Sequence, residues 1–276
     1  MSLFDDIDDI FSDNNVLDDK DIKMNSQLYN DPFPTLRQTM DKSVFYDDKD
    51  LVFHAIESEL RNAYVYNACF FPRPKSNKYR LFSRIKIDKK KKPTYEDHNI
   101  LKLGEYIPGK REIILYQKNI DSSEEGKDLP NILYFTTFIH ECMHALFDVP
   151  NHGSIGLPFI EEPIAEAGML NFIKKHCEQE QYEKCLKIVE NKKGALAHYG
   201  FGATLHKKSC EKRVLMVEVY QKICATCNQQ EVKKTIEKSP EYKDYVKAVF
   251  ANKHVKAYEC LKNIIFNVYD SYNLSH

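Results

Sequence analysis

Two histidines and a glutamate, His140, Glu141 and His144, stand in the order His-Glu-x-x-His within one segment of the chain. Residues four apart on a helix project from the same face, so both imidazoles can share one metal ion. Zinc takes neutral imidazole nitrogens at about 2 Å and lowers the pKa of its water toward about 7. A carboxylate that is not bound to the metal can then take the proton of that water. The spacing therefore predicts a zinc site with His140 and His144 as ligands and Glu141 as general base.

The surroundings of this motif favour a buried helix. The segment runs from Pro130 to Pro150, and Asp128 is placed to cap its start. Burying two histidines and a glutamate among apolar residues without a partner costs several kcal/mol, and a metal ion removes that cost. The neighbours of the motif are all uncharged: Phe138, Ile139, Cys142, Met143, Ala145 and Leu146.

At these residues the chain resembles the zincin superfamily of metallopeptidases. The metzincin branch continues its motif with a glycine and a third histidine, where this chain has Phe147 and Pro150, so the resemblance excludes that branch. The gluzincin branch takes a glutamate from a second helix, followed four residues later by an acidic residue that supports a histidine ligand. In FIEEPIAEAGML, Glu162 and Glu166 match those two places. The resemblance thus implies Glu162 as third zinc ligand and Glu166 as the supporting residue.

Two other residues compete for the third place. Glu161 precedes Glu162, but its neighbour four residues on is Ala165, and Pro163 blurs where the helix begins. His152 follows the motif after Pro150, in a segment typical of a loop.

The resemblance also implies a downstream histidine or tyrosine that steadies the oxyanion. The candidates are His198 and Tyr199 in GALAHYGFG, where a glycine-rich break between helices can present a side chain to a cleft. Such a donor is worth about 3 kcal/mol. The alternative is a structural turn. The resemblance covers residues 106–170, in which REIILY resembles the edge strand along which gluzincins lay an extended substrate.

Strand patterns come first and helix patterns later, which predicts an α+β fold. We expect a small mixed sheet packed on the motif helix, followed by a mainly helical C-terminal half. Residues 1–40, rich in Asp and Asn, form a flexible acidic arm or, alternatively, dock against a basic protein partner. Residues 41–276 form one zincin-like domain. The patterned segments are LVFHAIESELRNAYVY, YRLFSRIKI and REIILY, then the helices EEPIAEAGMLNFIKKH, YEKCLKIVEN, SCEKRVLMVEVYQKIC, EVKKTIEK and AYECLKNIIFNVY.

The net charge and the cysteines indicate which partners and which cellular compartment to expect. The net charge of -1 gives no field that would attract nucleic acid or an anionic membrane. No secretory signal or spanning apolar run is visible, and the lysines at 89–92 fit a solvated turn. Eight scattered cysteines favour reduced thiols in a cytoplasmic protein, although their even number leaves an oxidised alternative open. Cys224 and Cys227 form a lone CxxC, read as buried thiols rather than a redox or zinc pair.

The sequence thus predicts a zinc-dependent peptidase acting on a peptide or protein substrate. The alternative is a regulatory module that holds zinc without hydrolysis and binds partners through its acidic arm. Glu141 weighs against that alternative, because a purely structural site has no use for a base and is closed by four protein ligands.

Overall fold

The computed structural model describes residues 56–57, 59–60, 81–89, 94–95, 100–123, 129–148, 155–212 and 216–273. Five features of the sequence lie wholly or mostly outside these residues: the acidic arm, the helix predicted in LVFHAIESELRNAYVY, the lysine-rich turn, Asp128 and His152. Within the described ranges the α+β class is confirmed, since a small mixed sheet precedes a series of helices.

The three-stranded sheet has the order β1-β5-β4 and consists of β1 (Arg84–Asp88), β5 (Glu112–Tyr116) and β4 (Gly104–Ile107). β1 lies parallel to β5, and β4 lies antiparallel to it. Residues 113–116 are all buried, as a strand with a neighbour on each side requires. The prediction that REIILY is an edge strand is therefore wrong. β5 is the central strand, and β4 is an edge of this sheet among the described strands.

α7 (Pro130–Phe147) carries the His-Glu-x-x-His motif and packs against β4 and β5 on one side and against α8 and α11 on another. Pro130 occupies the first helical position, as predicted. The N-cap residue is Leu129, which makes no side-chain capping bond. Almost every described residue of α7 is buried, so this helix forms the centre of the core.

α8 (Pro158–His176) begins before the predicted start and runs through Pro163. Proline has no N–H, so the carbonyl of Phe159, four residues earlier, loses its partner within the helix. The hydroxyl of Tyr245, on α13 (Pro240–Phe250), donates to that carbonyl oxygen at 2.5 Å. A side chain from a distant helix thus replaces the missing bond, and the helix continues through the proline.

The remaining helices correct one prediction. The glycine-rich segment predicted as a break lies mostly inside α10. The segment predicted as a helix at 209–224 belongs to α10 up to Lys212 and to α11 from Met216, and residues 213–215 lie outside the described ranges. The bounds are α5 (Gln117–Ser122), α9 (Gln179–Glu190), α10 (Ala197–Lys212), α11 (Met216–Thr226), α12 (Gln229–Lys238) and α14 (His254–Asn273). A two-stranded ribbon joins β2 (Thr94–Tyr95) to β3 (Ile100–Leu101).

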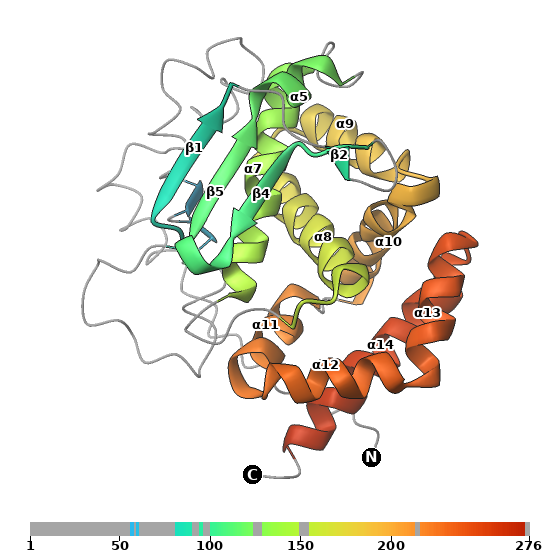
Figure 1. Ribbon diagram of the computed structural model, residues 1–276. Helices are drawn as coiled ribbons and strands as arrows, with labels where there is room; N and C mark the ends of the chain where they lie inside the picture. The colour runs from blue at the N-terminus through green and yellow to red at the C-terminus, as the bar shows by residue number, and fades with distance from the viewer. Residues whose placement is uncertain are drawn as a thin grey trace, which may run out of the picture.

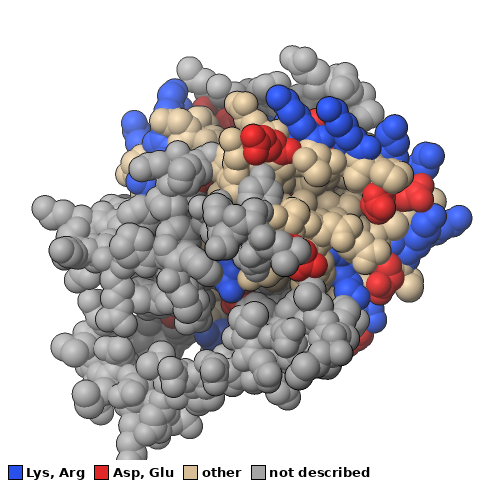
Figure 2. All heavy atoms as spheres, turned by 90° about the horizontal axis from the view of Figure 1, so that it is seen from below, with Lys and Arg blue, Asp and Glu red and all other residues tan. Residues whose placement is uncertain are grey.

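Figure 1 shows the sheet on one side of the molecule with α7 against it, then α8 alongside α7, and α9 and α10 beyond. Helices α11 to α14 gather below them. Among the described residues on the face seen in Figure 2, basic and acidic side chains are interspersed. Among the helices that the structure describes, none is both long and apolar enough to cross a membrane.

Candidate metal centre

α7 presents its two motif histidines side by side. His140 and His144 lie one turn apart, with ring centroids separated by 4.9 Å and the two Nε2 atoms by 3.1 Å. His140 is 8% exposed and Glu141 7% exposed, so the motif is buried at the wall of a cavity. The helical spacing in the sequence accounts for this part of the site.

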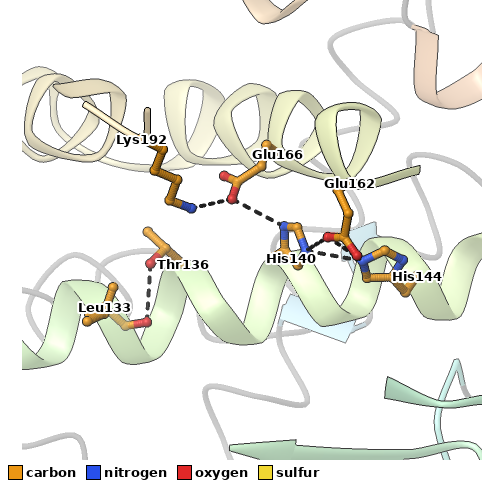
Figure 3. A network of polar contacts seen from close by, with 7 residues as sticks. All are labelled: Leu133, Thr136, His140, His144, Glu162, Glu166 and Lys192. Carbon is orange, nitrogen blue, oxygen red and sulfur yellow. Dashed lines mark hydrogen bonds and ion pairs between the residues drawn. The ribbon is translucent and has the colours of Figure 1, made fainter. Parts of the chain in front are cut away.

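α8 brings a carboxylate to both histidines (Figure 3). Oε2 of Glu162 lies 2.9 Å from Nε2 of His140 and 3.3 Å from Nε2 of His144. The approach of α8 to α7 depends on Gly168. A Cβ there would come within 2.7 Å of Met143 Sδ on α7 and 2.8 Å of Val217 on α11.

The three ligand atoms fit a metal ion. Atoms bound to zinc at about 2.0 to 2.1 Å in a tetrahedron stand about 3.3 Å apart. The distances among His140 Nε2, His144 Nε2 and Glu162 Oε2 are 2.9, 3.1 and 3.3 Å, at or slightly below that edge. This triad is the only cluster of its kind among the described residues. Two imidazoles and one carboxylate are a donor set typical of catalytic zinc, with a fourth place left open.

Burial and charge shape the protonation of these groups. Burial opposes the charge of Glu162, but the two imidazoles outweigh it and hold the pKa of that carboxyl well below its usual range. Burial likewise disfavours a charge on His144, but Glu162 outweighs it and raises the pKa of His144 to about 9. For Glu141 burial dominates and raises the pKa of the carboxyl, against the effect of the neighbouring histidines. The two carboxyls of the site thus differ: the pKa of Glu162 is lowered by its histidine partners, and the pKa of Glu141 is raised by burial.

The two candidate third ligands take different places. Glu162 contacts both histidines, whereas the hydrogen bonds of Glu161 Oε1 are to other residues, although both carboxylates lie on the cavity wall. Oε1 of Glu161 accepts bonds from the backbone N–H of Gly156 at 2.8 Å and from the hydroxyl of Tyr220 at 2.7 Å. Glu161 therefore fastens the start of α8 to α11, while Glu162 stands in the triad.

Glu166, one turn after Glu162, lies behind the first histidine. Its Oε1 is 3.7 Å from Nδ1 of His140 and also forms an ion pair with Lys192 (Figure 3). Sequence reasoning placed Glu166 near a histidine but missed Lys192. Its local signal, NKKG after a helix, is that of a solvated turn, so nothing in the neighbouring sequence could have found it.

The two candidate donors to the oxyanion, His198 and Tyr199, take different places. Both lie in the first turn of α10, but only Tyr199 lines the cavity, with its ring centroid 6.0 Å from that of His140. His198 packs against Phe159 with ring centroids 5.3 Å apart and is absent from the cavity wall. Burial lowers the pKa of His198.

The cavity in front of the triad has a volume of about 330 Å³. One wall is β4 and the residues before it, and the other comes from α9 and the start of α10. Gly104 lets β4 approach α7, because a Cβ there would lie 2.7 Å from Thr137 Cγ2 and 3.2 Å from Glu141 Oε1. A larger residue at this position would displace the strand or the carboxylate.

The lone CxxC contributes nothing to this centre. Cys224 is fully buried and Cys227 is 8% exposed, as predicted, and neither forms a disulfide bond. Burial raises the pKa of the Cys224 thiol well above its usual value. None of the seven cysteines that the structure describes forms a disulfide bond.

Comparisons of the chain with protein-family models, with curated proteins and with solved structures find no match.

Proposed function

We propose that this chain is a zinc-dependent peptidase that resembles the gluzincin branch of the zincins. One observation carries the proposal: His140, His144 and Glu162 place three ligand atoms at tetrahedral spacing on the wall of a cavity, with the unliganded carboxylate of Glu141 beside them. A closed structural site would have a fourth protein ligand and no adjacent base.

Zinc, when bound, would activate a water molecule and polarise a carbonyl group. Glu141 is the proposed residue that transfers protons. Its Oε1 lies on the cavity wall, 3.2 Å from the position that a Cβ on Gly104 would occupy, where it can take the proton of the attacking water and return it to the leaving nitrogen. Tyr199, on the cavity wall near His140, is the proposed donor to the oxyanion, and His198 is set aside because it does not reach the cavity.

The edge strand β4 favours an extended peptide as substrate. The backbone N–H of Tyr116 donates to the carbonyl of Leu103 at 2.8 Å, so the groups of Gly104 and Tyr106 point away from β5. Main-chain groups on such an edge can pair with an extended peptide. β4 therefore takes the place that the resemblance had given to REIILY.

The test is Glu141→Gln, which keeps shape and hydrogen bonding but removes the base. Zinc content and Tm should stay close to those of the parent. Cleavage of any peptide that the parent cleaves in a mixed library, followed by mass spectrometry, should fall by about 10⁴-fold. His140→Ala serves as the comparison for loss of metal.

Two outcomes would contradict the proposal. If Glu141→Gln loses zinc as His140→Ala does, Glu141 is a ligand rather than a base. If zinc-loaded parent cleaves nothing, the chain is the zinc-holding module that the sequence left as the alternative.

A further inference from the structure

A line of charged side chains extends from the proposed centre along the wall of the cavity to Lys192, whose side chain is 26% exposed. Glu162 contacts His140, Glu166 lies 3.7 Å behind the same ring, and Lys192 forms an ion pair with Glu166 (Figure 3). These residues come from three parts of the chain: α7, α8 and the turn after α9. The last member, Lys192, has no role in the proposed chemistry.

Glu166 needs this cation. It is 3% exposed, and an ionised carboxylate at that depth is costly unless a charge partner is close. Lys192 is the basic side chain that forms an ion pair with it. Oε1 is the atom that Lys192 contacts, whereas Oε2 is buried and makes no hydrogen bond among the described residues.

A nitrogen atom of His140 is in the same situation as Oε2 of Glu166. Nδ1 of His140 is also buried without a hydrogen bond among the described residues, and it is the ring atom that faces Glu166. A histidine that binds metal through Nε2 carries its proton on Nδ1 and usually donates it to a carboxylate. With Oε1 held by Lys192, a small rotation of the Glu166 carboxylate gives that proton its acceptor.

The glycines of the GALAHYGFG segment hold this line in place. A Cβ on Gly200 would overlap the carbonyl oxygen of Lys192, and a Cβ on Gly202 would overlap Cβ of Glu166. The Lys192 ammonium also lies over the ring of Tyr199, 5.2 Å from its centroid. The segment therefore seats α10 directly on Lys192 and Glu166 while Tyr199 faces the cavity.

We propose that Lys192 is a positioning residue: it fixes the Glu166 carboxylate behind His140, and so the orientation of that ligand, and it also holds the ring of Tyr199. This proposal rests on the proposed zinc site. It assigns a role in metal affinity to a residue that contacts neither the metal ligands nor, in the proposed chemistry, the reacting atoms.

The test compares zinc affinity, measured by competition with a chelator, in three lysine variants. Lys192→Met keeps the aliphatic stem and removes the charge, and it should weaken zinc binding by ~10-fold or more. Lys192→Arg keeps the charge and should restore most of the affinity. The matched control is Lys207→Met, which breaks the exposed α10–α9 ion pair with Glu190, 2.5 Å long, and should leave affinity unchanged.

A fourth comparison separates positioning from general loosening of the fold. If Lys192 acts through Glu166, Lys192→Met should lower zinc affinity little further in a Glu166→Gln background. Additive losses, or an unchanged affinity in Lys192→Met, would overturn the role of Lys192 while leaving the zinc site intact. A parent chain that binds no zinc would instead overturn the proposed function itself, together with this inference.

Discussion

Two buried clusters contain histidines from other helices and one residue each from α8, namely Glu162 near its start and Asn171 further along, and they differ in how the histidine ring nitrogens are used. At the proposed metal centre, two Nε2 atoms and one carboxylate oxygen converge on one point at the cavity wall. In the second cluster, fully buried His206 has a neutral partner for each nitrogen. Nδ1 lies 2.6 Å from Oδ1 of Asn171, and Nε2 lies 2.7 Å from the hydroxyl of Tyr182.

The charge environments of the clusters are also opposite. Glu162 raises the pKa of His144, whereas burial, aided by Lys174 and Lys207, lowers the pKa of His206 to about 4. Burial alone therefore does not mark a ligand histidine. Convergence of several lone pairs beside an anion does, because only that arrangement is relieved by a cation.

The largest expected effect is on zinc affinity, which should depend on the histidines of the proposed metal centre and not on His206. The parent should hold about one zinc per chain. His140→Ala or His144→Ala should weaken that binding by more than the ~100-fold that outer partners can contribute, whereas His206→Gln should leave it unchanged. Metal analysis after dialysis, followed by chelator competition, measures both. Full zinc occupancy in the double variant of His140 and His144 would remove the proposed centre.

The next largest effect is the difference in zinc binding between variants of the adjacent residues Glu161 and Glu162. Glu162→Ala should lose tight zinc binding because a direct ligand is gone. Glu161→Ala should keep zinc but lower the free energy of unfolding by ~1 to 3 kcal/mol, since the N–H of Gly156 and the hydroxyl of Tyr220 lose their acceptor. Chelator competition and denaturant unfolding are measured on both. The reverse result for zinc would mean that the ligand is Glu161.

A smaller effect concerns the strand that faces the base. Gly104→Ala should lower activity by about 100-fold at unchanged zinc content, because the new methyl group pushes β4 or Glu141 out of place by a fraction of an ångström or more. Gly109→Ala is the control, since a Cβ there meets nothing within 4 Å. Equal activity of the two variants would show that the close approach of β4 is irrelevant to the reaction.

The smallest expected effect is the contribution of the second cluster to the pH dependence of stability. As pH falls below about 6.5, the unfolded chain protonates His206, while the folded protein keeps it neutral down to about 4. The unfolded state binds more protons in that window, so the stability contributed by this group is lost as pH falls. His206→Gln should show a shallower decline of Tm between these pH values. An identical slope in parent and variant would contradict the lowered pKa.

Local spacing was enough to predict the helix and the histidine pair, because four residues make about one turn wherever the helix lies. The distinction between Glu161 and Glu162 needed the true start of α8, and Pro163 hid that start. The helix survives its proline through the hydroxyl of Tyr245, a contact 86 positions away that no local pattern encodes.

Other features depended on partners distant in sequence. The sequence of β5 does not show whether the strand is central or at an edge. It is central because β1 pairs with one side of it and β4 with the other. His198 and Tyr199 are neighbours about 100° apart on a helix, so one reaches the cavity and the other packs on Phe159. Lys192 acquires its partner Glu166 only when α9 and α10 fold onto α8.

The short segment from Gly156 to Glu161, just before the proposed ligand Glu162, is tied down by three helices that come later in the chain. Tyr220 of α11 donates to Glu161, Lys233 of α12 to the carbonyl of Gly156, and Tyr245 of α13 to the carbonyl of Phe159. The helices after α10 are thus not a detachable module. A fragment that stops at α10 retains every proposed ligand and loses all three of these hydrogen bonds. The residues that would bind the metal are therefore contained in a shorter stretch of chain than the residues needed to hold them in position.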